Sequence, residues 1–271
     1  MDLRSEQTVS GGGITIILPC KDQLEKFLAA SLDSVLNQEL HAWKLLVVVD
    51  VNTPDNIQKL VAFSARDSRI SMLVCHEQSM ASAINMGMRH AETEFVCLLL
   101  SDDAIDKSAV RVLDNYIRRY PDVDFFHSSR RFIDGKGNAR SEIMRSKKEF
   151  SPDHFKQYGS PVKHLMCWRR QKGLDIGGMD TDVQSHGCDD YDFPWRMAEA
   201  GCKFMAVDEC LYYYRVHHEF YRLTTNVPLQ TQVTSLRTMF RKHGVPNGES
   251  ENYIRRAVLG YLLRDKALNY E

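Results

Sequence analysis

Residues 95–103 read FVCLLLSDD, a run of six apolar residues that ends in a serine and two aspartates. An apolar run of this length that is bounded by charge is typical of a buried β-strand. Adjacent carboxylates at the end of such a strand are costly unless a cation or a basic group neutralises them. Carboxylate oxygens are the ligands that Mg²⁺ and Mn²⁺ prefer, and those ions commonly bind diphosphates. This stretch therefore predicts a metal site at the end of a buried strand.

A second acidic cluster lies far along the chain, where residues 189–196 read DDYDFPWR. One of its carboxylates is a candidate general base. A metal site and a general base together indicate a metal-dependent transfer reaction on a nucleotide-activated substrate.

Both acidic clusters also have simpler structural interpretations. The first could cap the helix expected after it, because Asp is favoured at helix N-caps. The second suits the first turn of a helix, where negative charge complements the helix dipole. Within it, Asp192 is expected either to cap the helix or to pair with Arg196 four residues further on. The presence of both clusters favours the catalytic interpretation.

Apolar runs and helical spacing alternate through the first hundred residues. Strands are expected at residues 14–18, 43–49, 70–74 and 95–100, with helices between them at residues 24–37, 55–64 and 80–90. This alternation predicts an α/β fold with a mostly parallel sheet and right-handed crossovers. Ligands bind at the carboxyl ends of the strands in such sheets. Pro19, Asp50 and the first acidic cluster should therefore converge.

The remaining chain gives a weaker pattern. Helices are expected at residues 108–120, 189–200, 229–243 and 252–268, and strands at residues 123–127, 203–207 and 211–216. Residues 134–138 read DGKGN, which is typical of a hairpin turn. Residues 141–160 are mixed and charged, and no element is assigned to them.

Composition limits the class of protein. With 271 residues, 43% of them hydrophobic, the chain is long enough for one large α/β domain. A net charge of −1 argues against a nucleic-acid-binding protein. Seven cysteines without a CxxC pair are interpreted as buried free thiols in a reducing cytosol. No signal peptide or transmembrane stretch is evident, so a cytoplasmic protein is expected.

The expected C-terminal helices carry basic residues beside apolar ones. Ordinary packing or a homo-oligomer interface is favoured for them. A peripheral contact with the inner face of a membrane is the alternative.

Several blocks of sequence, in this order and spacing, resemble family 2 glycosyltransferases of the GT-A fold. They are residues 14–19 with 30–38, residues 45–50, residues 83–87 with 99–104, residues 177–196, and the Tyr-Arg-Val-His element at 214–217. The resemblance implies a flexible N-terminus at 1–13, a glycosyltransferase domain at 14–223 and a C-terminal helical extension at 224–271. Within the domain, residues 14–104 would form the nucleotide-sugar half and residues 105–223 the acceptor half.

The resemblance implies roles for residues on the donor side. Asp103 is expected to ligate Mn²⁺ or Mg²⁺, and His217 to complete the metal shell or touch the diphosphate. Asp102 would face the ribose or share the ion. Other residues expected to line the nucleotide-sugar site are Pro19, Lys21, Asp50 and Asn85. Asp50 could instead be a simple turn acid, and His217 a structural histidine.

On the acceptor side, Asp190 is expected to be the general base. Further residues expected beside the acceptor or behind it are Gly178, Asp189, Trp195, Arg196 and Arg215. Arg215 and Arg222 would offer charge-assisted bonds to phosphate. Trp168 and Trp195 are equally compatible with stacking on a sugar and with core packing.

The implied activity is inverting transfer of a sugar, from a UDP-sugar by family default, to a glycan or lipid-linked saccharide in a surface polysaccharide pathway. The sequence departs from the family where Leu100 replaces an acid and Ile84 an arginine. These changes give some support to a non-catalytic relative that binds sugar or a partner. A sugar-phosphate nucleotidyltransferase is the other alternative, although residues 20–23 lack the glycine-rich loop that it needs.

Overall fold

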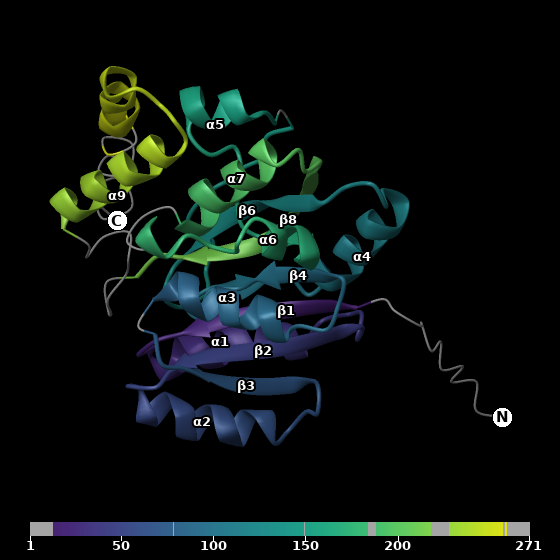
Figure 1. Cartoon of the computed structure of the whole chain (residues 1–271). Helices are drawn as coiled ribbons and strands as arrows, with labels where there is room; N and C mark the ends of the chain where they lie inside the picture. The colour runs from purple at the N-terminus through teal and green to yellow at the C-terminus, as the bar shows by residue number, and fades with distance from the viewer. Residues whose placement is uncertain are drawn as a thin grey trace.

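A mixed sheet lies at the centre of the computed structural model, which describes residues 13–77, 79–148, 150–183, 188–217, 228–256 and 258 (Figure 1). Within these residues the sheet has eight strands in the order β3-β2-β1-β4-β7-β6-β8-β5. The strands are β1 (Ile14–Cys20), β2 (Trp43–Asp50), β3 (Ile70–Cys75), β4 (Phe95–Leu98), β5 (Ala104–Ile105), β6 (Phe125–Ile133), β7 (Met166–Arg169) and β8 (Phe204–Arg215).

The first half of the sheet is parallel, as predicted. Ile14 of β1 lies opposite Trp43 of β2 and Phe95 of β4, and β2 pairs in parallel with β3. The connecting helices are α1 (Glu25–Leu36), α2 (Pro54–Ser64) and α3 (Met80–His90). All seven residues of β1 are buried, because helices cover both faces of this half.

The second half is mixed, so the sheet as a whole is less parallel than the sequence predicts. β7 runs antiparallel to β4 and β6, β8 runs parallel to β6, and β5 runs antiparallel to β8. The two short strands predicted at 203–207 and 211–216 are one strand, β8. The exposed charges of Asp208 and Glu209 imitate a turn in the sequence, but the strand continues through them.

The other helices are α4 (Ala109–Arg119), α5 (Pro152–Tyr158), α6 (Arg170–Asp175), α7 (Phe193–Glu199) and α9 (Leu229–Lys242). The 3-10 turn η1 (Thr181–Val183) and the π-helical turn η2 (Cys188–Asp192) precede α7. The helix predicted at 189–200 therefore begins as a π-helical turn. No helix in the described ranges is long and apolar enough to span a bilayer.

Some predictions fall on other parts of the chain. Residues 1–12 and 218–227 lie outside the described residues, as does most of the helix predicted at 252–268. The predicted domain boundaries stay predictions.

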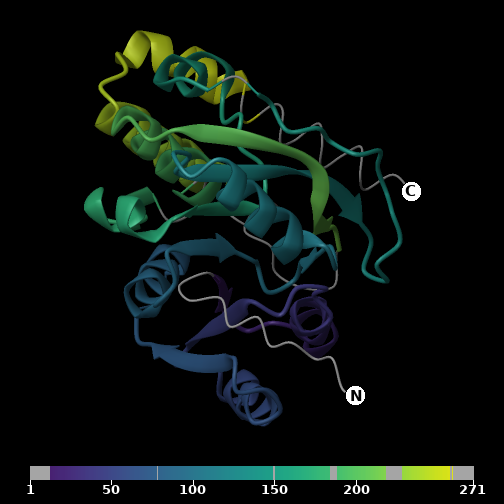
Figure 2. The ribbon, with the colours of Figure 1, turned by 90° about the vertical axis from the view of Figure 1, so that its right-hand side faces the viewer.

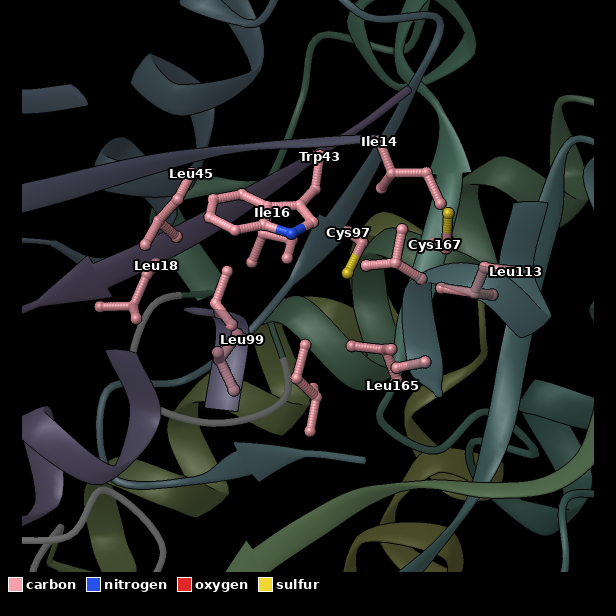
Figure 3. Close-up of a cluster of buried hydrophobic side chains, with 14 of the residues drawn as sticks. Ile14, Ile16, Leu18, Trp43, Leu45, Cys97, Leu99, Leu113, Leu165 and Cys167 are labelled. Carbon is pink, nitrogen blue, oxygen red and sulfur yellow. The ribbon is translucent and has the colours of Figure 1, made fainter. Parts of the chain in front are cut away.

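Two hydrophobic clusters form the core, one on each side of the sheet. One joins β1, β2 and β4 to α1, α2 and α4, and its side chains near Ile16 and Leu99 are drawn in Figure 3. The other joins the opposite face of the sheet to α3, α7 and α9. Helix α3 approaches β1 so closely that a Cβ at Gly87 would lie 2.6 Å from Ile17 Cγ2. This contact explains a glycine inside a helix.

The sequence predicts seven free cysteines, and the side chains of six of them are described. None of these six forms a disulfide: Cys20, Cys75, Cys97, Cys167, Cys202 and Cys210. Burial, with the charge of Asp22 as a smaller cause, raises the pKa of Cys20 to about 12. A thiol with so high a pKa is unreactive at neutral pH.

Candidate active site

The carboxyl ends of β1, β2 and β4 meet at one edge of the sheet, as predicted. Lys21 follows β1, and its Nζ lies 3.7 Å from Asp50 Oδ2 at the end of β2. Gln23 Nε2 donates to Ser101 Oγ at 3.4 Å, which links the end of β1 to the acidic cluster after β4.

Asp50 is buried and has one carboxylate oxygen without a hydrogen bond. Its Oδ1 accepts from the backbone N–H and the side-chain amide of Asn52, at 2.9 and 3.0 Å. Its Oδ2 has no hydrogen-bond partner, since Lys21 Nζ stays beyond hydrogen-bond distance. A buried acceptor of this kind can receive an N–H group from a ligand.

Asp103 is fully engaged by the protein. It is 1% exposed, and its Oδ2 accepts from the Tyr212 hydroxyl at 2.7 Å while its Oδ1 accepts from the Arg215 backbone N–H at 2.6 Å. Burial and the neighbouring charge of Asp102 raise the pKa of Asp103 to about 7. Burial and the charge of Asp103 also raise the pKa of Tyr212, so its phenol stays protonated and donates.

Asp102, by contrast, is half-buried and lies beside His217. The Asp102 side chain is 22% exposed, and its Oδ2 lies 3.5 Å from His217 Nε2. Both ring nitrogens of His217 are buried without a hydrogen-bond partner. The contact between Asp102 Oδ2 and His217 Nε2 is therefore an ion-pair contact and not a hydrogen bond. The nitrogens of the imidazole remain available to a ligand beside this carboxylate.

Arg215 holds the acidic loop in place. Its Nε donates to the backbone oxygen of Asp102 at 2.7 Å, and its Nη1 donates to that of Asp134 at 3.0 Å. The guanidinium carbon also lies 5.2 Å from the centre of the Phe27 ring. These contacts make Arg215 a positioning residue. Its Nε and Nη1 groups, which were predicted to bind phosphate, instead donate to backbone oxygens of the protein. Arg222 lies outside the described residues.

The second acidic cluster lies on the π-helical turn η2. Asp189 is buried, and its Oδ2 lies 3.0 Å from His164 Nε2. Burial acts to raise the pKa of Asp189, but the hydrogen bond and charge of His164 hold it below its usual value. Asp190 is half-buried. Its backbone oxygen accepts a hydrogen bond from Ser160 Oγ.

Two residues that the sequence did not single out for the site connect the two clusters. The Tyr212 hydroxyl binds Asp103, and the Tyr212 ring centre lies 5.1 Å from that of His164. His164 in turn binds Asp189, the neighbour of Asp190. The clusters therefore converge across the sheet. Tyr212 is one of three consecutive tyrosines, at 212–214, and no local sequence pattern marks it or His164 as a site residue.

A glycine turn attaches the acceptor half to α3. Asn85 donates to the Met179 backbone oxygen at 2.9 Å and accepts from the Met179 N–H at 2.6 Å. Gly178 has φ +74°, and a Cβ there would lie 2.3 Å from Asn85 Oδ1. Only glycine suits this position. The amide of Asn85, predicted to bind the donor, is thus engaged in fixing this turn.

Arg196 ties the same turn to α7. Its Nε donates to Asp192 Oδ2 at 2.8 Å, which confirms the predicted pair. Its other nitrogens donate to the backbone oxygens of Ile176 and Gly178 at 3.0 and 2.5 Å.

Trp168 and Trp195 pack in the core. Of the two interpretations given above for these side chains, the structure therefore supports core packing and not stacking on a sugar. Trp168 is 0% exposed and Trp195 is 2% exposed. The Trp195 ring stacks on His243 at 3.7 Å, and His243 also contacts Asp192 and Glu199. Trp195 therefore connects α7 to the end of α9.

The donor set at Asp102 and His217 fits a divalent cation. In the described residues, no three His, Cys, Asp or Glu side chains form a preformed metal cage. Mg²⁺ commonly binds through one or two carboxylates and completes its shell with substrate phosphates and waters. Asp102 supplies a carboxylate of this kind, and the unpartnered imidazole of His217, 3.5 Å away, could add a nitrogen ligand.

Comparison with known proteins identifies the family. Residues 15–175 match the family described as Glycosyl transferase family 2. The chain belongs to this family. An uncharacterized glycosyltransferase of Methanocaldococcus jannaschii is 22% identical over 209 residues, which cover 75% of this chain and 70% of that protein. The family match favours a glycosyltransferase over the nucleotidyltransferase alternative.

A relative with a named reaction matches a shorter segment. WfgD of Escherichia coli, a UDP-Glc:alpha-D-GlcNAc-diphosphoundecaprenol beta-1,3-glucosyltransferase, is 35% identical over 91 residues. The match covers 33% of this chain and 35% of WfgD.

Solved structures confirm the predicted GT-A-like α/β fold. S. aureus TarS 1-349 in complex with UDP has a TM-score of 0.65 at 17% identity, over 84% of this chain and 64% of that one. GalNAc-T7 with UDP, GalNAc and Mn²⁺ has a TM-score of 0.62 at 11% identity, over 83% and 47%. This family member thus spans less than two thirds of either solved chain.

Proposed function

We propose that this family 2 glycosyltransferase moves a sugar, with inversion, from a nucleoside-diphosphate sugar to a hydroxyl of a glycan or lipid-linked acceptor. The observation that carries the proposal is the convergence of the two acidic clusters through Tyr212 and His164. A UDP-sugar is the default donor, because two solved neighbours hold UDP. A lipid-linked acceptor is suggested by the named substrate of WfgD.

The donor would bind across the ends of β1, β2 and β4. The unpaired Oδ2 of Asp50 is suited to accept an N–H of the nucleobase, with Lys21 and the chain after Pro19 beside it. This site agrees with the rule that ligands of open α/β sheets bind at the carboxyl ends of the strands.

Asp102 and His217 would hold Mn²⁺ or Mg²⁺ beside the diphosphate. The sequence prediction made Asp103 the main ligand and allowed Asp102 to share the ion; we assign the ligand role to Asp102 because both oxygens of Asp103 already accept protein hydrogen bonds. Asp103 instead fixes the loop that presents Asp102. A bound divalent ion would neutralise the negative charge that builds on the leaving nucleoside diphosphate.

Asp190 would be the general base. Its carboxylate takes the proton of the acceptor hydroxyl while that oxygen attacks the anomeric carbon and the bond from this carbon to the diphosphate breaks. One displacement from the face opposite the leaving group inverts the anomeric centre. The contact between His164 and Asp189 holds the turn that carries Asp190.

The test compares the wild type with Asp190→Asn. Donor binding is measured by calorimetry, turnover by release of nucleoside diphosphate, and the product anomer by NMR. The loss of a general base lowers the turnover rate by about 10²- to 10⁴-fold, and donor affinity should stay within about twofold because the metal site is untouched.

Two results would contradict the proposal. Unchanged turnover in Asp190→Asn would exclude Asp190 as the base, and a product that retains the donor configuration would exclude a single displacement. A non-catalytic binding protein would show no turnover in the wild type either.

A further inference from the structure

Arg130 is a buried arginine of β6 that no described carboxylate neutralises. The residue is 5% exposed, and its Nε has no hydrogen-bond partner. Among the described residues, the guanidinium contacts two aromatic rings and no carboxylate. Buried charges in proteins are normally paired, because removing a charge from water is costly.

Two aromatic rings flank the guanidinium. Its central carbon lies 5.1 Å from the centre of the Tyr214 ring and 5.4 Å from that of Phe132. A cation–π contact offsets only part of the desolvation cost of a buried charge. The charge of Arg130 is therefore under-compensated in the protein alone, which is the state expected of a residue that binds an anion.

Arg130 lies on the side of the β6–β8 pair that faces the active site. Arg130 is in register with Tyr212, and Phe132 is in register with Tyr214. Side chains of residues in register point to the same face of a sheet. The Tyr212 hydroxyl reaches Asp103 from this face.

The segment that begins with Arg130 is strongly basic. Residues 130–148 contain seven Lys or Arg and two Asp or Glu, whereas the whole chain has a net charge of −1. This segment folds back on β6 through bridges of Arg130 with Met144 and of Ile133 with Ala139, and it extends beyond the end of β6 (Figure 2). Some of its cations are paired, such as Lys148 with Asp208. The excess of positive charge adjoins Arg130.

We propose that Arg130 binds an oxyanion, a phosphate or a carboxylate, carried by the acceptor, with the basic segment 136–148 at the rim of this site. The planar guanidinium matches both groups in a two-point contact. The acceptor is the favoured source because the diphosphate of the donor is already assigned to Asp102 and His217. The inference rests on the proposed function, because the anion is assigned to the acceptor molecule of the proposed sugar transfer.

The test uses Arg130→Met, with Arg131→Met as the matched control. Arg131 is the next residue of the same strand, and its Nε likewise has no hydrogen-bond partner. Arg131 is less buried than Arg130 and lies on the opposite face of the sheet, so its substitution removes the same charge from that face. Glucose 1-phosphate, glucuronate and neutral glucose are the probes, titrated calorimetrically into the wild type and both variants in EDTA without nucleotide. The first two probes distinguish a phosphate from a carboxylate.

We expect one of the charged probes to bind the wild type and to bind Arg130→Met about 10- to 100-fold more weakly. This factor corresponds to the loss of one charge-assisted hydrogen bond. Binding to Arg131→Met should stay within about twofold. The inference is overturned if neither charged probe binds the wild type better than glucose does. It is also overturned if the two variants lose affinity equally.

Thermal unfolding separates a binding role from a structural one. Arg130→Met replaces an under-compensated charge with an apolar side chain, so its melting temperature should equal or exceed that of the wild type. A clear fall would assign Arg130 a structural role and contradict the inference. None of these measurements involves turnover, so failure of this inference is distinct from failure of the Asp190 test.

Discussion

Replacing Tyr212 with phenylalanine removes one hydroxyl from the centre of the site and leaves the ring packing intact. This hydroxyl donates to Asp103 Oδ2 at 2.7 Å and accepts from the Leu100 N–H at 3.2 Å. A hydrogen bond to a charged group contributes about 1.5–3 kcal/mol, and a buried donor left unpaired adds a further cost of about 1 kcal/mol. The free energy of unfolding should therefore fall by about 2.5–4 kcal/mol.

The adjacent Tyr213→Phe is the matched control for this change. The Tyr213 hydroxyl donates to Asp106 Oδ2 at 2.6 Å, but Asp106 also accepts two hydrogen bonds from Ser108 and both residues are partly exposed. Water can replace the lost hydroxyl there, so a loss of about 0.5–1.5 kcal/mol is expected.

Urea unfolding followed by tryptophan fluorescence measures both variants, and an unchanged m-value shows that the midpoint reports stability. Tyr212→Phe should also weaken metal affinity or activity by about 10- to 100-fold, as loss of a residue that supports a metal ligand commonly does. If Tyr212→Phe costs no more stability than Tyr213→Phe and leaves activity unchanged, the role given to Asp103 is refuted.

Three further predictions follow from local geometry. Gly178→Ala must adopt φ +74° with its Cβ 2.3 Å from Asn85 Oδ1, so it should lose about 2–4 kcal/mol of stability in urea unfolding; a loss below about 1 kcal/mol would contradict the close contact. His243→Gln removes the ring that contacts Asp192, Glu199 and Trp195, and about 1–3 kcal/mol should be lost in the same assay; an unchanged midpoint would show that α9 is held by other contacts. Burial raises the pKa of Asp103 to about 7, above the value of about 4 in the unfolded chain, so the folded state binds this proton more tightly. Stability of the metal-free protein should consequently fall as pH rises from about 4 to about 7, and Asp103→Asn should fall less; equal slopes would contradict the raised pKa.

The parallel half of the sheet was predictable because its information is local. Apolar runs such as residues 14–18 and 95–100 mark the buried strands, and helical spacing marks α1 and α3 between them. β7 was missed because it is four residues long and enters the sheet between β4 and β6 by long-range pairing. The short helices α5 and α6, which precede and follow β7 along the chain, were also missed.

The candidate site was predictable in outline and not in detail. The sequence marks two adjacent carboxylates after β4 but cannot show which one turns inward, because strand alternation ends before them. The structure buries Asp103 and leaves Asp102 half-buried because Tyr212 and Arg215, more than a hundred residues further along, donate to Asp103. His164 is likewise brought to Asp189 by tertiary structure alone. Both contacts depend on pairing that local sequence does not encode.

The most direct test of the central claim is calorimetric titration of UDP, and then of the other nucleoside diphosphates, with and without Mn²⁺. The proteins are the wild type, Asp102→Asn and Asp103→Asn. The account predicts Mn²⁺-dependent binding of one nucleotide to the wild type, loss of the Mn²⁺ dependence in Asp102→Asn, and a weakening of about 10-fold in Asp103→Asn. Loss of the dependence in Asp103→Asn with retention in Asp102→Asn, or Mn²⁺-independent binding throughout, would contradict it.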